Sequence, residues 1–254
     1  MILIHRVTPF AIGAIGALGF ASLLEHWMAP QTSVLFTLVL MALLFARLLV
    51  WRVRTFAFWH FFATPLLYLL AAFSMLFLFE GRMLSLILSV VSVILLVLFA
   101  EYLFQFTHLP SQYQPYSIEY LTLLLNILTI FSLSSFAYGA HLLIQFPLWI
   151  LATGFFLFFW FVLYGTLWVS KAEDSGSRPY ALAGAILTTE FFVTLSFLPS
   201  GLYTNASFIT LFFYLFLGLT RAQVRHKLSS TVVKRYLIVA AILFAAVLVS
   251  SDWS

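Results

Sequence analysis

The chain contains no cysteine, so disulfide bonds, thiolate nucleophiles and thiolate metal sites are all excluded. Charged residues are scarce as well: they make up 8% of the 254 residues, against roughly 25% in a typical water-soluble domain. A chain with so few charges cannot cover its own surface in water. Apolar residues make up 64%, and the mean hydropathy is +1.11. This composition predicts a polytopic membrane protein.

Long polar segments are also missing. The loops between the apolar runs reach only roughly 10–15 residues, too few to build a hydrophobic core of their own. We therefore expect residues 1–254 to form one integral membrane domain without a soluble domain. The first run resembles a signal peptide, but more membrane segments follow it, so we interpret it as an uncleaved first span.

Nine apolar runs are long enough to cross a bilayer as helices, which takes about 20 residues each. They cover residues 7–27, 32–51, 56–79, 83–104, 117–138, 142–169, 180–199, 203–220 and 234–252. Gly139 marks the predicted break between the fifth run and the sixth. The predicted fold is an all-α transmembrane bundle of about nine spans.

The cations give this bundle an orientation. With nine spans, eleven of the twelve Lys and Arg residues fall on one side of the membrane, and only Arg82 falls on the other. The eleven are Arg6, Arg47, Arg52, Arg54, Lys171, Arg178, Arg221, Arg225, Lys227, Lys234 and Arg235. The positive-inside rule then predicts a cytoplasmic N-terminus and an outside C-terminus, in a plasma or inner membrane. Because topology accounts for the cations, we expect no nucleic acid partner.

A single carboxylate interrupts the predicted seventh span. Residues 187–199 read LTTEFFVTLSFLP, with Glu190 as their one charged residue. If the span begins near Tyr180, Glu190 lies about 15 Å into the bilayer, roughly at the midplane. Thr194 lies on the same helix face. We expect this face to form a helix–helix interface instead of facing lipid.

A partner for Glu190 is predicted on the fifth span. Glu119, Thr122, Asn126 and Thr129 form a polar stripe at helical spacing there, and Asn126 lies at a similar depth to Glu190. An amide can both donate to and accept from a carboxyl group. Two readings stay open: a hydrogen bond that fixes helix packing, or a proton or substrate site made of Glu190, Asn126, Thr194, Thr122 and Glu119.

Small residues form further stripes. Gly13, Gly16 and Gly19 in the first span allow close helix approach, which indicates packing within the bundle or an oligomer interface. Ser85, Ser89 and Ser92 line one face of the fourth span, where we expect packing.

Histidines and carboxylates gather near the predicted cytoplasmic face. His60, Glu101, His108 and Glu119 lie there, but none of the common metal-binding spacings occurs, so we expect solvated side chains, no metal and no cofactor. A lipid-modifying enzyme built around His60 and His108 is the weaker alternative, and we expect the protein not to be an enzyme.

The most basic segment is RAQVRHKLSSTVVKR, residues 221–235. Its five cations are Arg221, Arg225, Lys227, Lys234 and Arg235. They act as topology signals, and anionic lipid headgroups at the cytoplasmic face or a membrane-protein partner are candidate ligands.

The last third of the chain resembles a known group. Glu190 precedes LSFLP (195–199), FFYLFLGL (212–219) follows, and Arg235-Tyr236 opens a final span that ends near Trp253. This pattern is similar to uncharacterised multi-pass membrane proteins of candidate-phyla (Patescibacteria-type) bacteria. The resemblance implies a membrane architecture and a bacterial source, and no function.

Two functions follow from these patterns. The first is a non-catalytic membrane protein that acts as a packing, assembly or lipid-interacting component, with the lipid bilayer, a membrane protein or a second copy as partner. The alternative is a small transporter or channel with a midplane proton or substrate site at Glu190 and Asn126.

Overall fold

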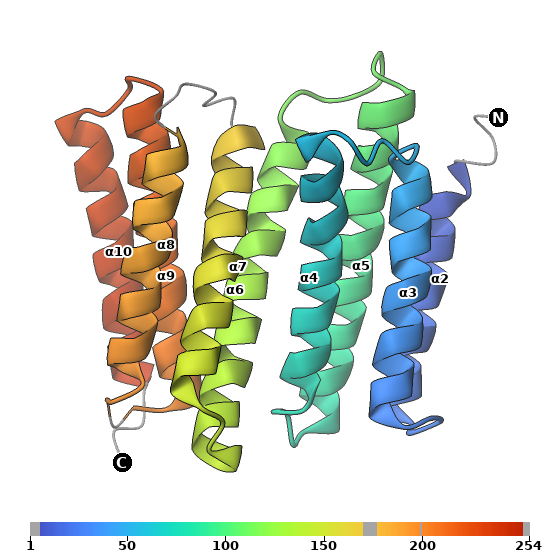
Figure 1. The fold of residues 1–254 in the computed structure, drawn as a ribbon, viewed down its shortest axis with the longest axis horizontal. Helices are drawn as coiled ribbons and strands as arrows, with labels where there is room; N and C mark the ends of the chain where they lie inside the picture. Colours follow the sequence, from blue (N-terminus) through green and yellow to red (C-terminus); the bar gives the residue numbers. More distant parts are fainter. Residues whose placement is uncertain (1–5, 170–176, 199, 251–254) are drawn as a thin grey trace. The chain divides into compact units, whose positions relative to one another are not determined.

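The computed structural model describes residues 6–169, 177–198 and 200–250, and all regular secondary structure in these ranges is helical. Figure 1 shows the nine helices. They are α2 (Thr8–Leu24), α3 (Pro30–Leu48), α4 (Phe56–Leu76), α5 (Arg82–His108), α6 (Ser117–Ile144), α7 (Leu148–Val169), α8 (Ser177–Leu195), α9 (Leu202–Val224) and α10 (Ser230–Ser250). Each predicted apolar run corresponds to one of these helices, so the all-α prediction is confirmed.

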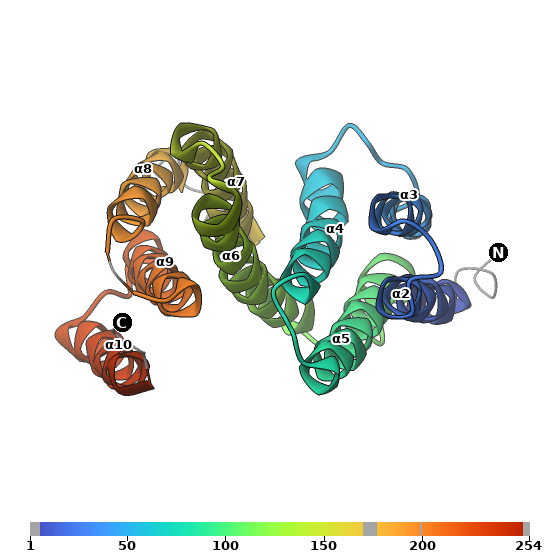
Figure 2. The same cartoon turned by 90° about the horizontal axis from the view of Figure 1, so that it is seen from below.

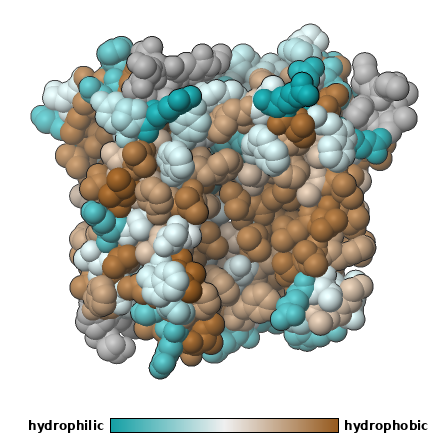
Figure 3. Space-filling view, in the orientation of Figure 1, coloured by the Kyte–Doolittle hydropathy of each residue, from teal (hydrophilic) through white to brown (hydrophobic). Residues whose placement is uncertain are grey.

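Seven of the described helices are long and apolar enough to cross a membrane: α3, α4, α5, α6, α7, α9 and α10. The other two are α2, which has 17 residues, and α8, which carries Arg178 and Glu190. On the face drawn in Figure 3, hydrophobic side chains fill the middle of the helices near the N-terminus, and hydrophilic ones lie toward the helix ends. This apolar multi-helix architecture is that of a membrane protein.

The chain divides into two compact units, Met1–Thr129 and Ile130–Ser254, and α6 contributes to both. In the first unit, α2 packs against α3 and α5, and α4 packs against the same two helices (Figure 2). In the second unit, α8 packs against α7 and α9, and α10 packs against α9. In both units, helices joined by short connections thus pack side by side, and α2 also packs against α5.

Glycines bring α2 close to its neighbours in the first unit. A Cβ atom at Gly19 would lie 2.5 Å from Cγ2 of Thr37 on α3, and one at Gly13 would lie 2.8 Å from Cγ2 of Val97 on α5. Both distances are shorter than any normal carbon–carbon contact, so the helices approach this closely only because these positions lack a side chain. The prediction that the glycine stripe serves packing is confirmed.

The serine stripe of α5 also faces the interior. Ser85, Ser89 and Ser92 are all buried. The hydroxyl of Tyr68 on α4 donates to Oγ of Ser92 over 3.1 Å, which joins α4 to α5. A buried hydroxyl in an apolar medium needs such a partner. The predicted packing role of this stripe is therefore confirmed.

Aromatic rings form the core of the second unit. The ring of Phe192 on α8 stacks on Phe155 of α7, with 4.3 Å between centroids, and on Tyr138 of α6, at 4.7 Å. The hydroxyl of Tyr138 donates to the Phe192 carbonyl over 3.0 Å. Stacked rings at these separations attract each other beyond simple area burial. Phe192 therefore contacts both α6 and α7 from α8.

The predicted break at Gly139 is wrong. Helix α6 continues through Gly139 to Ile144, and α7 begins at Leu148 instead of residue 142. The chain turns at Gln145, which has a φ of 52°, and the Phe146 N–H bonds back to the Ala140 carbonyl over 3.2 Å. A lone glycine costs a helix only about 1 kcal/mol, so it does not end one by itself.

Candidate functional site

Glu190 does not lie in a helix–helix interface of its own unit, and this part of the prediction is wrong. Its side chain is exposed, as is that of Thr194 one turn later. The Thr194 hydroxyl donates to the Glu190 backbone carbonyl over 2.8 Å, so it is engaged within its own helix.

The reason lies in which face of α8 its neighbours cover. The buried residues of this helix recur at helical spacing: Ala181, Ala185, Thr188, Phe192 and Leu195. Glu190 is two residues from both Thr188 and Phe192, about 200° around the helix. Helices α7 and α9 pack against the aromatic and alanine face, so the carboxylate points away from them.

The position of Glu190 along α8 also differs from the prediction. The helix begins at Ser177 and ends at Leu195. Glu190 therefore lies about 20 Å from the start of the helix and only about 8 Å from its end. It is not at the centre of this helix. A side chain so near the helix end can extend toward the interfacial region.

Three residues of the polar stripe on α6 are buried. Thr122, Asn126 and Thr129 are 0%, 3% and 1% exposed. Asn126 belongs to the first unit and Glu190 to the second. The contact between Asn126 and Glu190 stays a prediction, and so does a transport site composed of them.

Glu119, the remaining member of the proposed site, has a structural partner. The Tyr113 hydroxyl donates to Oε2 of Glu119 over 3.1 Å and accepts from the Ile118 N–H over 3.2 Å. Burial, together with the nearby Glu119 charge, raises the pKa of Tyr113 to about 12, so its hydroxyl keeps its proton at neutral pH. Glu119 also lies in the first turn of α6, where a negative charge is favourable. These contacts organise the start of the helix.

His60 is not solvated at a membrane face, contrary to the prediction. It is 1% exposed, and its ring lies 6.2 Å from that of Phe56 and 5.5 Å from that of Phe61. The position is one turn inside α4, where the rings of Phe56 and Phe61 of the same helix lie beside it. His108 stacks on Phe104, with 5.2 Å between ring centroids. No group of three or more potential metal ligands occurs among the residues that the structure describes.

The five cations of residues 221–235 surround the connection between α9 and α10. Arg225, Lys227, Lys234 and Arg235 are exposed, and Arg221 is half-buried. We call these five residues the basic surface. Lys171, another of the predicted topology signals, lies outside the described residues. The basic surface has the exposure that an electrostatic contact with anionic headgroups requires.

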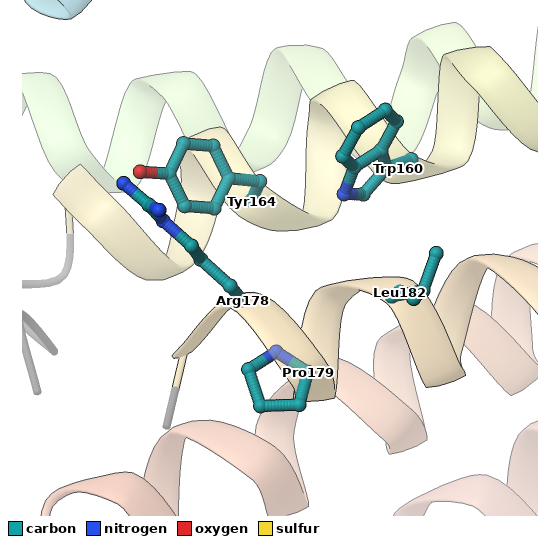
Figure 4. A pocket seen from close by; sticks show the side chains of 5 residues that line it. All are labelled: Trp160, Tyr164, Arg178, Pro179 and Leu182. Atoms are coloured by element: carbon teal, nitrogen blue, oxygen red, sulfur yellow. The ribbon is translucent and has the colours of Figure 1, made fainter. Parts of the chain in front are cut away.

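A pocket of about 370 Å³ lies between α7 and α8 in the second unit. Its lining residues are Trp160, Tyr164, Arg178, Pro179 and Leu182. Figure 4 shows the Arg178 side chain extending from the first turn of α8 toward α7, so that its guanidinium group lies beside Tyr164. The combination of one cation with aromatic and aliphatic walls was not recognised in the sequence, because the two halves come from different helices.

Asn205 has a structural role, although Asn205-Ala206-Ser207 matches a glycosylation sequon. The residue is buried at 2% exposure, its Nδ2 donates to the Leu195 carbonyl over 3.1 Å, and its Oδ1 accepts from Ser200 over 2.6 Å. It thereby satisfies the end of α8 from the first turn of α9. An amide held in this way is not available to carry a glycan.

Comparisons of the chain with protein-family models, with curated proteins and with solved structures gave no match. The resemblance to membrane proteins of candidate-phyla bacteria therefore stays a prediction.

Proposed function

We propose that this chain is a nine-span membrane protein, with a cytoplasmic N-terminus and an outside C-terminus, that acts as a non-catalytic packing, assembly or lipid-interacting component. The basic surface contacts anionic lipid headgroups at the cytoplasmic face. The observation that carries the proposal is the gathering of exposed cations at one end of a unit that is otherwise apolar.

The nine-span count is supported by the packing of the two helices that fall outside the seven candidates. α2 packs along α3 and α5, and α8 packs along α7 and α9. The residues that α2 uses are glycines, which suit close helix contacts inside a bilayer. A helix packed lengthwise between spanning neighbours shares their environment.

The orientation is supported by the charges of each unit on its own. In the first unit, Arg47 lies in the last turn of α3, whereas Arg82 begins α5 at the opposite helix end. In the second unit, the start of α8 and the connection between α9 and α10 lie at the same end (Figure 1). Arg178 and the basic surface thus share one side of this unit.

The non-catalytic role is supported by how the internal polar groups are used. Ser22 and Ser33 hydrogen-bond each other over 2.7 Å between α2 and α3. Tyr68 bonds to Ser92, and Tyr138 bonds to the backbone of α8. Hydrogen bonds of this kind stabilise helix association in membranes by about 0.6 kcal/mol each, and up to about 2. These internal polar groups serve packing.

Cysteine labelling tests the topology, and the absence of native cysteine makes each variant a single reporter. Ser177→Cys and Ser229→Cys are expected to react with a membrane-impermeant maleimide only after the cells are permeabilised. Gly201→Cys and Met28→Cys are expected to react in intact cells. Equal labelling of Ser177→Cys and Gly201→Cys in intact cells would show that α8 does not cross, and the inverse pattern would reverse the orientation.

Neutralising the basic surface tests the lipid contact. The variant Arg225→Gln/Lys227→Gln/Lys234→Gln/Arg235→Gln is expected to lose most of the extra thermal stability that phosphatidylglycerol confers over phosphatidylcholine. The reason is that each cation near an anionic surface contributes about 1 kcal/mol. The wild-type difference should also shrink in high salt, because these charges are exposed.

The matched control for that measurement is Arg82→Gln, which removes a cation from the other helix end. Arg82 is exposed and pairs with Glu25 over 2.6 Å. An exposed pair contributes about 0–1 kcal/mol, so this variant should keep the response to phosphatidylglycerol. If the control loses the response as the fourfold variant does, the response depends on the net charge of the protein, and the basic surface is not a headgroup contact.

A further inference from the structure

We propose that the pocket between α7 and α8 is a binding site for one anionic phospholipid. Arg178 would hold the phosphodiester beside Tyr164, and Trp160 and Leu182 would contact the start of an acyl chain. The proposal rests on the placement of the chain in a bilayer argued above, but its site is separate from the basic surface.

The polar end of the pocket is formed by residues from two helices. Arg178 lies in the first turn of α8 and is exposed, and Tyr164 lies near the end of α7. In Figure 4 the guanidinium group and the phenol oxygen lie on the same side of the pocket. A guanidinium group offers planar paired donors that match a phosphate. Among the residues that the structure describes, Arg178 forms no ion pair with a carboxylate.

The apolar end of the pocket lies one helical turn away from the polar end on both helices. Trp160 is four residues before Tyr164, and Leu182 is four residues after Arg178. Because α7 and α8 run in opposite directions, both steps lead to the same side, about 6 Å from the polar end. Trp160 and Leu182 are 45% and 43% exposed, so the wall that they form is open to an occupant.

The arrangement of a cation at one end of the pocket and an apolar wall at the other favours one class of ligand. A free phosphate ion would use the cation and leave the tryptophan and leucine wall bare, whereas an acyl chain alone would leave Arg178 unused. A phospholipid carries both parts in the order in which the pocket presents them. Tryptophan and arginine are also residues that lie at the level of the headgroups in membrane proteins. Charge complementarity favours a headgroup with net negative charge, such as phosphatidylglycerol.

Native mass spectrometry of the full chain in detergent tests the site. We expect one tightly bound dioleoyl-phosphatidylglycerol, and weaker binding of the phosphatidylcholine with the same acyl chains. Arg178→Gln should weaken the first lipid about tenfold or more, because it removes charged hydrogen bonds to the phosphate. Arg178→Lys, which keeps the charge without the planar fork, should fall between the two.

The control is Arg82→Gln, which removes an exposed cation outside both the pocket and the basic surface and should leave the first lipid in place. Trp160→Ala and Leu182→Ser change the apolar wall and keep the Arg178 charge. Each should weaken binding of the same lipid. Both therefore test the site even if Arg178→Gln fails to fold. Wild-type affinity in Arg178→Gln, or in the Trp160 and Leu182 variants, would overturn the proposal.

Two other outcomes would also overturn it. Displacement of the lipid by inorganic phosphate at equal concentration would identify a simple anion site. Equal affinity for phosphatidylglycerol and phosphatidylcholine would show that the headgroup charge is not recognised. The proposed function has an independent test. That test measures the fourfold variant of the basic surface, in which Arg178 is unchanged.

Discussion

Replacing Phe192 by alanine is expected to lower the free energy of unfolding by about 3 kcal/mol. The side chain is 0% exposed, and its ring stacks on Phe155 and Tyr138. Lipid is as apolar as this core, so the loss does not come from a hydrophobic transfer term. It comes from the missing ring contacts and from the cavity that they leave. Unfolding in mixed micelles, followed by circular dichroism, measures the change.

The matched control is Phe197→Ala, in the turn that follows the end of the same helix. Phe197 is 76% exposed, so its removal opens no cavity and should change the free energy of unfolding by less than about 0.5 kcal/mol. Phe192→Leu, which keeps most of the volume, should fall between the two alanine variants. Equal effects at positions 192 and 197 would show that the aromatic stack does not hold the second unit together.

Replacing Gly184 by leucine is expected to destabilise the protein by about 3 kcal/mol or more. A Cβ atom at this position would overlap the ring of Phe216 on α9 and would lie 2.8 Å from Cδ1 of Leu163 on α7. The Phe216 ring and the end of the Leu163 side chain would have to move aside for this first carbon, and the remaining carbons of a leucine would then press α7 and α9 apart. Packed helices do not deform without losing contacts along their length. The yield of monodisperse protein and its unfolding midpoint measure the effect.

A graded series separates this clash from a general effect of side-chain size. Gly184→Ala should cost less than Gly184→Leu, because only the first carbon has to be accommodated. The control is Gly154→Leu on α7, where a Cβ atom would meet nothing within 4 Å. This variant should be tolerated. If the substitutions at Gly154 and Gly184 have equal effects, α8 is not held by its close approach to α7 and α9.

The sequence predicted the helices well because the membrane imposes a strong and local rule. Backbone polar groups must be satisfied within each segment in lipid, so a long apolar run forms a helix whatever its neighbours are. Helix ends were predicted less accurately, because the rule applies to the interior of a run and does not say where the chain turns. Gly139 looked like a break, but the helix continued to Ile144, because the turn depends on the left-handed residue Gln145 and on backbone bonds across it.

Side-chain surroundings were predicted unevenly. The serine and glycine stripes were correctly assigned to packing, because small residues are compatible with little else at close helix contacts. Glu190 was placed on the wrong face, and His60 was expected to be solvated. Both errors concern which side of a helix its neighbours cover. The sequence of one helix does not contain that information.

What the sequence by itself determined is the class of the protein and the type of its elements: an all-α, apolar chain with its cations at the ends of its helices. Those features follow from composition and from local backbone energetics. Only the tertiary structure decided that Phe192 and not Glu190 faces the interior of the second unit, and that Arg178 meets Trp160 and Tyr164 at one pocket. Such contacts depend on the rotation of each helix about its axis, which packing between helices sets.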